Sequence, residues 1–386
     1  MSENRTLHMA LAMLLALALE LPVSCASGAE LAAVPGPQGP TRYVRTLVID
    51  SRGRLWASFM EEQGLGTYGI ACLETASPTV IPAAELSAGR VFALRALGNG
   101  SVAAATDNGL RVISSDGRVE AIGLQESLTL LAGAAGDAVL AAGTGADRTL
   151  VLVRYRPGLP PERWCLAAKG AGGFREPLRL FELPGGRVLI VFETGGVMFD
   201  DGKLRRLAWE KSPLASPERS RSSERRVPPV WIYDAAMAPD WSVFFTGFCK
   251  KLVRWKDGRF DVLAEGHFQD LAVDPGSGLM RVSDFAGTLS QWNGTALEPV
   301  FRQPAGEIRS LWPAASGALW LECAPASGPH LLVRFASGSA TPDTLSLGLR
   351  PGLLSPGILS IIEIPGAAAV IATNDGLWSI RAPAPH

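Results

Sequence analysis

A short pattern of apolar runs recurs along this 386-residue chain, in eight copies spaced roughly 35 to 55 residues apart from residue 43 to the C-terminus. The copies share one apolar run, a second run that follows a Gly or Asp turn, and a third run, which in five of the copies ends in an aromatic residue and a turn such as Asp-Gly or Asn-Gly. Such turns join antiparallel strands, and strand repeats of this length predict a β-propeller. We therefore expect an all-β fold of four-stranded antiparallel blades in a ring. Eight blades are expected, or seven if the third copy, the weakest one, is not a blade.

The first strand of each copy is expected to lie innermost in its blade. Small residues recur at its third position, which suits strands that crowd around an axis. The eight first strands are predicted to begin at residues 44–47, 91–94, 128–131, 178–181, 232–235, 268–271, 308–311 and 358–361. The eighth copy stops after its third strand, at Ile380. Residues 30–34 are predicted to supply the missing fourth strand and close the ring, because closure removes exposed sheet edges.

The aromatic residues that end the third strands form a column in the alignment of the copies. They are expected to pack between neighbouring blades rather than to form an exposed platform for a ligand. The column consists of Tyr155, Phe199, Trp255, Trp292 and Phe335.

The N-terminus has the pattern of an export signal. Residues 9–19 form an apolar run that is too short to span a bilayer, and small residues follow it. We predict a signal peptide over residues 1–29 and one propeller domain over residues 30–386. Ser24-Cys25 also resembles a bacterial lipobox, so the alternative is a lipoprotein with its lipid on Cys25. Both alternatives predict an exported protein, periplasmic or extracellular, or an outer-membrane lipoprotein.

The charge balance narrows the class of expected partner. Without residues 1–29, which hold Glu3, Arg5 and Glu20, the acidic and basic residues are equal in number. This balance argues against a nucleic-acid-binding protein, which needs a basic face.

The four remaining cysteines fall in four different repeats, so we expect buried thiols rather than disulfides. They are Cys72, Cys165, Cys249 and Cys323.

One segment interrupts the repeat. Residues 210–229 are rich in Arg, Ser, Pro and Glu and are too polar to contribute to a core. We expect a flexible loop between the fourth and fifth copies. It is either a solvated insertion or a docking site for an acidic partner.

Three of the copies contain short motifs that are similar in sequence to a known repeat. Residues 50–56 (DSRGRLW), 105–110 (ATDNGL) and 372–378 (ATNDGLW) resemble the two-component-regulator propeller repeat. In that family, the propeller is the extracytoplasmic, ligand-sensing part of a larger sensor kinase. The resemblance implies a propeller that senses or binds a ligand. No kinase part follows in this sequence, so a detached binding or scaffold propeller is expected.

The chain shows no recognisable catalytic motif or cofactor motif. Residues 64–69 match GxGxxG, but an apolar strand pattern follows where a dinucleotide site needs a helix. We therefore expect no cofactor, and a non-catalytic propeller that binds a small anionic or saccharide ligand, or an envelope protein. Arginine forks bind carboxylates, and aromatic rings stack on sugars. The candidate ligand-binding residues lie where the first strands begin, at the mouth of the channel: Arg45, Phe92, Arg179, Trp231, Tyr233, His267 and Arg309.

Two alternatives to this site remain open. The arginines are instead ordinary rim residues if they pair with Asp107, Glu193 or Glu322 on nearby loops. The chain is instead a calcium-dependent lactonase or hydrolase if Asp234 and Asp270, at third positions of first strands, hold a calcium ion near the axis.

Overall fold

The computed structural model of the chain describes residues 30–33, 44–60, 68–73, 79–122, 125–134, 137–145, 147–167, 176–207, 209, 212–215, 230–274, 276–303, 306–325, 330–337, 342–346, 358–364, 369–373 and 376–381. The predicted signal peptide over residues 1–29, with Cys25, lies outside these residues, as does most of the predicted loop over 210–229. Of that loop, residues 212–215 are described, and Ala215 forms a β-bridge with Val230.

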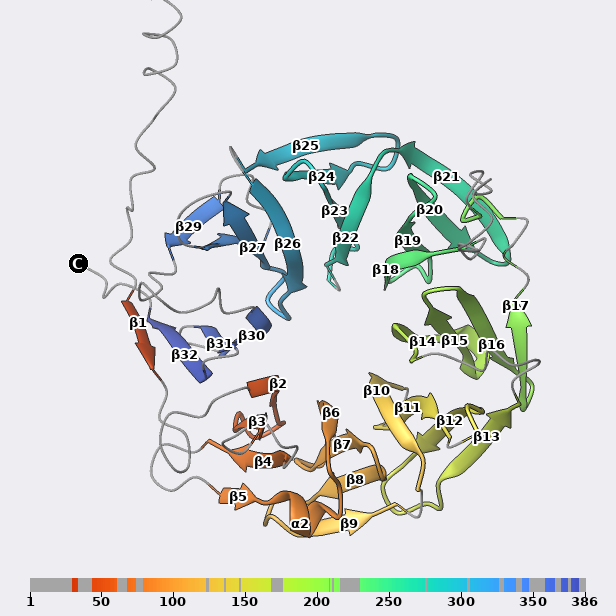
Figure 1. Cartoon of the computed structure of the whole chain (residues 1–386), viewed down its shortest axis with the longest axis vertical. Helices are drawn as coiled ribbons and strands as arrows, with labels where there is room; N and C mark the ends of the chain where they lie inside the picture. The colour runs from red at the N-terminus through yellow and green to blue at the C-terminus, as the bar shows by residue number, and fades with distance from the viewer. Residues whose placement is uncertain are drawn as a thin grey trace, which may run out of the picture.

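Eight four-stranded antiparallel sheets surround a central channel, which confirms an eight-bladed β-propeller (Figure 1). We number the blades 1 to 8 along the chain. The innermost strands are β2 (Val44–Ile49), β6 (Val91–Ala96), β10 (Ser127–Gly133), β14 (Arg179–Leu183), β18 (Ile232–Met237), β22 (Phe268–Val273), β26 (Gly306–Pro313) and β30 (Ile358–Glu363). The second strands are β3 (Leu55–Met60), β7 (Val102–Thr106), β11 (Val139–Thr144), β15 (Arg187–Phe192), β19 (Val243–Gly247), β23 (Met280–Asp284), β27 (Leu319–Pro325) and β31 (Ala369–Thr373).

The third and fourth strands complete each blade toward the outside. The third strands are β4 (Tyr68–Cys72), β8 (Gly109–Ile113), β12 (Leu150–Tyr155), β16 (Gly195–Asp200), β20 (Lys251–Lys256), β24 (Thr288–Trp292), β28 (Leu331–Phe335) and β32 (Gly376–Arg381). The outermost strands of blades 1 to 7 are β5 (Thr79–Ile81), β9 (Val119–Ala121), β13 (Glu162–Leu166), β17 (Lys203–Leu207), β21 (Arg259–Glu265), β25 (Leu297–Arg302) and β29 (Pro342–Ser346). A short helix, α2 (Ala83–Leu86), joins blades 1 and 2, and a 3-10 turn, η1 (Pro184–Gly186), joins β14 to β15.

The N-terminal strand closes the ring, as the sequence predicts. Strand β1 (Glu30–Ala33) pairs antiparallel with β32 and is the fourth strand of blade 8. Figure 1 shows the first and last strands of the chain side by side. Closure therefore joins the two ends of the propeller through backbone hydrogen bonds, which removes the open edge of β32.

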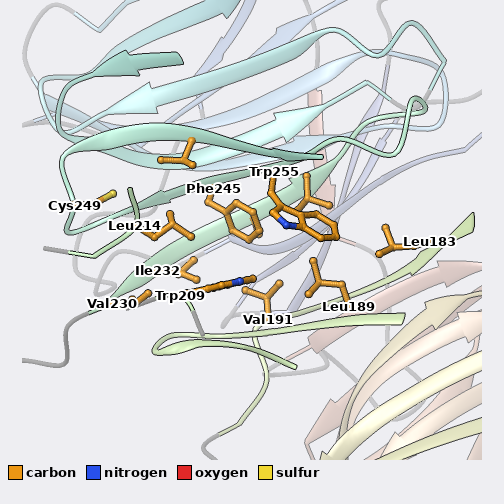
Figure 2. Packing of buried hydrophobic residues seen from close by; sticks show 13 residues of the cluster. Leu183, Leu189, Val191, Trp209, Leu214, Val230, Ile232, Phe245, Cys249 and Trp255 are labelled. Carbon is orange, nitrogen blue, oxygen red and sulfur yellow. The ribbon is translucent and has the colours of Figure 1, made fainter. Parts of the chain in front are cut away.

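The core is divided among the interfaces between neighbouring blades. The described buried residues form eight apolar clusters, one at each interface. Figure 2 shows the cluster between blades 4 and 5, where Val191 and Leu189 meet Phe245 and Trp255. Four of the five residues in the predicted aromatic column are buried, namely Tyr155, Phe199, Trp255 and Phe335. The column therefore belongs to the core, as expected, and not to a ligand platform.

The cysteines lie in blades 1, 3, 5 and 7, too far apart to be bridged to one another. Cys72, Cys249 and Cys323 are buried, as predicted, and burial raises the pKa of the Cys323 thiol to about 12. The prediction is wrong for Cys165, which is exposed. It lies on β13, an outermost strand, and side chains on the outward face of such a strand have no further blade to cover them.

Asp50 begins DSRGRLW, the first of the three motifs that are similar to the known repeat. It lies in the turn between β2 and β3, and its side chain stabilises that turn. The buried Asp50 carboxylate accepts hydrogen bonds from the backbone N–H groups of Arg52 (2.9 Å) and Arg54 (3.0 Å) and from Trp56 Nε1 (2.9 Å). It also forms an ion pair with Arg54 Nε at 2.7 Å. Burial raises the pKa of this carboxyl, but the hydrogen bonds from Trp56 and Arg54 outweigh that effect and hold it below its usual value.

The Asp50→Ala variant is expected to lose about 2–4 kcal/mol of unfolding free energy, because the buried indole N–H of Trp56 is left without an acceptor. Urea unfolding at neutral pH measures this loss. The matched control is Asp147→Ala, in an exposed turn where the carboxylate accepts from the Thr149 N–H at 3.0 Å. Equal losses in the two variants would contradict the role of Asp50.

Candidate functional site at the channel mouth

The inner strands all begin at the same end of the channel, which we call the mouth. A pocket of about 450 Å³ opens there between blades 4 and 7. We call it the mouth pocket. Its polar wall consists of Arg179, Glu193, Asp234, Gln269, Asp270 and Arg309. Its aromatic wall consists of Trp231, Tyr233 and Phe285.

The structure gathers four of the seven candidate residues in the mouth pocket and leaves three outside. Those inside are Arg179, Trp231, Tyr233 and Arg309. Arg45 instead lies over the ring of Phe92, with the guanidinium carbon 5.2 Å from the ring centroid, at the junction of blades 1 and 2. His267 is exposed and does not line the pocket; its carbonyl accepts a hydrogen bond from the Phe285 N–H at 3.2 Å.

The position of Arg179 in its strand differs from the sequence alignment by one residue. The alignment places Leu178 at the first position of β14, where the other inner strands carry a buried apolar residue. The structure buries Pro177 instead. Arg179 therefore occupies the third position, and it pairs with Val191 just as Asp234 pairs with Thr246. Leu178 donates its N–H to the Val191 carbonyl at 2.7 Å, as the extra residue of a β-bulge.

Third-position side chains of blades 4, 5 and 6 form a polar chain that crosses from blade to blade. Arg179 Nη2 lies 2.5 Å from Asp234 Oδ1. Asp234 Oδ2 accepts the backbone N–H of Leu271 in blade 6 at 3.2 Å, and Asp270 Oδ2 accepts the N–H of Leu311 in blade 7 at 2.7 Å. Each carboxyl group therefore satisfies a backbone donor of the next blade. The sequence located both aspartates but not these partners.

The two aspartates are also hydrogen-bonded to each other. Burial raises the pKa of Asp270 to about 9, and the neighbouring Asp234 adds to this shift through its hydrogen bond and its charge. Two adjacent carboxyl groups in a poorly solvated site share a proton, because both cannot ionise cheaply. At neutral pH, Asp270 is therefore a neutral acid that donates to Asp234.

The rim arginines have partners other than those considered from the sequence. Arg179 pairs with Asp234, and Arg309 Nε lies 2.9 Å from Glu307 Oε1 on its own strand. Asp107 accepts the N–H of Gly89 at 2.9 Å, and Glu322 lies 2.8 Å from His330 Nδ1 within blade 7.

The aromatic wall includes a residue that sequence reasoning missed. Phe285 lies in the turn between β23 and β24 and is 50% exposed. Its ring meets that of Tyr233, itself 37% exposed, edge to face at 5.9 Å between centroids. The sequence did contain a signal for Phe285: it is an aromatic residue in a turn between a second and a third strand, and such turns lie at the mouth.

The aspartate pair does not suit a calcium ion. Calcium takes six to eight oxygen ligands, most of them from carboxylates, carbonyls and water. Here, Asp234 faces the Arg179 guanidinium, and the oxygens of both carboxyl groups accept backbone N–H groups. Among the residues that the structure describes, no three His, Cys, Asp or Glu side chains gather as a metal-binding group.

No protein-family model matches the sequence, and no curated protein matches it. Many solved structures share its fold. Sqt1 from Chaetomium thermophilum, solved with the N-terminus of ribosomal protein L10, has a TM-score of 0.59 at 13% identity, over 92% of this chain and 100% of that one. The computationally designed protein Ika8 has a TM-score of 0.57 at 14% identity, over 91% of this chain and 99% of that one.

Two extracellular domains are also among the matches. The extracellular domain of a putative one component system from B. thetaiotaomicron has a TM-score of 0.49 at 14% identity, over 90% of this chain and 53% of that one. A second structure, titled as the extracellular domain of a putative hybrid two component system, has a TM-score of 0.47 at 12% identity over 75% of this chain. This chain spans 38% of the length of that second protein. At these identities the likeness concerns the fold.

Within the described part of the chain, none of the helices has the length and apolar character needed to cross a membrane.

Proposed function

We propose that this chain is a non-catalytic binding propeller that holds a segment of a partner protein in the mouth pocket. The observation that carries the proposal is the exposed pair of Tyr233 and Phe285 at the edge of a polar pocket. Exposed aromatic residues in a concave site are the usual anchors of protein interfaces, because they bury a large apolar area with little loss of side-chain freedom. The complex of Sqt1 with the L10 N-terminus supports this reading, since a propeller of similar length there holds a chain terminus.

The proposal places the protein outside the cytoplasm. Its support is the apolar run and the small residues within residues 1–29. The N-terminal sequence of the exported protein tests this placement: it begins at Glu30 after signal-peptide cleavage, or at a lipid-modified Cys25. A protein that keeps Met1 contradicts the export signal.

The hydrolase alternative receives less support from the contacts in the pocket. A general acid needs a carboxyl group that can reach a bound substrate. Asp270 Oδ2 accepts the N–H of Leu311 in the next blade and Oδ1 accepts the N–H of Leu271 on its own strand, so both oxygens are already engaged by the backbone. Calcium-dependent hydrolysis of lactones by the purified protein, abolished by EDTA and in Asp270→Asn, would establish this alternative instead.

The test uses the chain from residue 30 to residue 386 and a displayed library of random peptides. Peptides selected by the wild-type protein are expected to bind at least about tenfold more weakly to the double variant Tyr233→Ala/Phe285→Ala, since aromatic anchors contribute about 2 kcal/mol or more each. The matched control is Trp241→Ala. Trp241 is 46% exposed in the turn between β18 and β19, at the opposite end of the channel. Selected peptides that bind the double variant as well as the wild type would refute the mouth pocket as the binding site.

A further inference from the structure

Trp241 occupies a turn position where blades 1, 2 and 7 carry glycine. In those blades, the hairpin between the first and second strands places Gly53, Gly100 and Gly317 at positive φ, and each donates its N–H across the turn. Trp241 has the same position in blade 5, with a φ of 65°, and its N–H donates to the Ala238 carbonyl at 2.9 Å. The left-handed region is unfavourable for a bulky side chain, so this tryptophan strains its turn.

The strained side chain is also exposed. Trp241 lies at the end of the channel opposite the mouth, which we call the far face, and nearly half of its surface is accessible to solvent. The charges beside it are paired, since Lys256 Nζ lies 2.8 Å from Asp240 Oδ2. An exposed aromatic residue in a strained turn lowers stability rather than raising it, which points to a role in contact with another surface.

A second apolar side chain is exposed at the far face. Leu159 lies in the turn between β12 and β13, the third and fourth strands of blade 3, and it is 55% exposed. Pro160 and Pro161 follow it and are exposed as well. Single apolar residues are common on protein surfaces, so what the two apolar tips contact has to be inferred from a further observation.

That observation is the place where the chain enters the propeller. Third strands run from the mouth to the far face, and Glu30, the first residue of β1, pairs with Arg381, the last residue of β32. Residues 26–29 separate Glu30 from Cys25, the alternative site of a lipid. A chain of this length spans at most about 18 Å, so a lipid on Cys25 would be held close to the far face. The entry at blade 8 and the apolar tips of blades 3 and 5 are spread around the ring, and together they define one face.

We propose that the far face lies on a membrane surface, with Trp241 and Leu159 in the interfacial layer and the mouth directed away from the lipid. Tryptophan is enriched in that layer because its ring is apolar while its indole N–H can remain hydrated. Since the charges beside Trp241 are paired, this contact does not require anionic lipids. The inference rests on the proposed export, and it leaves the mouth free for the proposed partner segment.

The experiment is hydroxyl-radical footprinting on vesicles, measured residue by residue with mass spectrometry. The chain over residues 26–386 carries an N-terminal hexahistidine tag, which binds nickel-chelating lipid in phosphatidylcholine vesicles and replaces a lipid on Cys25. We expect the oxidation of Trp241 and Leu159 to fall severalfold relative to the same protein without vesicles, because interfacial side chains are shielded by headgroups. Tyr233 and Phe285, at the mouth, are internal controls and are expected to keep their reactivity.

The Trp241→Gly variant separates the aromatic anchor from the tether. Glycine suits the left-handed turn, so the variant is expected to unfold at the same or a higher temperature than the wild type. On vesicles, Leu159 of this variant is expected to regain the reactivity that it has without them. The matched control is Phe285→Ala at the mouth, in which Leu159 is expected to stay protected. If Leu159 stays protected in Trp241→Gly, the tether alone orients the propeller and the role of Trp241 is wrong. A variant that unfolds at a lower temperature would contradict the strain argument.

The outcomes also separate this inference from the proposed function. If Trp241 stays reactive on the vesicles, the membrane contact is wrong, and the test of peptide binding at the mouth is unaffected. If Tyr233 and Phe285 are protected instead, the mouth faces the lipid, which contradicts both proposals. A failure of the proposed export shows in the N-terminal sequence of the protein and not in this experiment, because the tag replaces the lipid.

Discussion

A chain that begins at Val34 instead of Glu30 is expected to be less stable by about 2–4 kcal/mol and to associate as its concentration rises. The four residues of β1 pair with Trp378, Ser379, Ile380 and Arg381 of β32. Removing them deletes that ladder, and each backbone hydrogen bond contributes about 0.5–1.5 kcal/mol net. It also leaves β32 as an open edge, which is a template for pairing with a second chain.

Thermal unfolding of the two chains, each without residues 1–29, measures the stability loss, and sedimentation at several concentrations measures the association. A synthetic peptide with the sequence of residues 30–34 is the matched control. It is expected to raise the melting temperature of the shortened chain and to leave that of the longer chain unchanged, because only the shortened chain has a vacant edge. Equal melting temperatures for the two chains, without association, would show that β1 contributes nothing to closure.

The fold was accessible from the sequence because its signals are local. Each blade repeats the same order of apolar runs, and glycine turns such as those at Gly53 and Gly317 separate its first two strands at positive φ. Ring closure was also predictable, since one strand was missing at the C-terminus and one apolar segment was unassigned at the N-terminus. These features depend on residues that are neighbours along the chain.

The site was only partly accessible, because it depends on contacts between blades. The sequence placed Arg45 and Arg309 at equivalent positions, but equivalent positions in blades 1 and 7 lie at different sectors of the ring, and only Arg309 reaches the mouth pocket. The alignment of β14 failed by one residue because Pro177 does not look like a strand residue. That shift turned Arg179 toward Asp234. A bulge shifts every later residue of a strand by one position, so the spacing along the sequence does not tell which blade the following side chains face.

The second large effect is expected from the Asp270→Asn variant, as a change in how stability depends on pH. In the folded protein, Asp270 keeps its proton up to a pH of about 9, whereas the pKa of an exposed aspartate is 3.8. Between these two values the folded state binds one more proton than the unfolded state, so the stability of the wild-type protein falls as the pH rises. The slope is at most about 1.4 kcal/mol per pH unit for one proton. Asparagine does not titrate, so this contribution is absent from the variant.

The variant preserves the contacts of the neutral acid with Leu311 and Asp234, while the Leu271 N–H keeps Asp234 Oδ2 as its acceptor. The amide oxygen of asparagine is expected to accept the Leu311 N–H, and its amide nitrogen donates to Asp234 as the protonated acid does. Urea unfolding at pH 5, 6, 7 and 8 is therefore expected to give a shallower pH slope for Asp270→Asn and a more stable variant at pH 8. Asp261→Asn, on an exposed ion pair of β21, is expected to keep the wild-type slope. Parallel slopes for the wild type and Asp270→Asn would mean that Asp270 is ionised at neutral pH. The blades would then be joined there by a charged carboxylate that Arg179 and the backbone N–H groups hold in place.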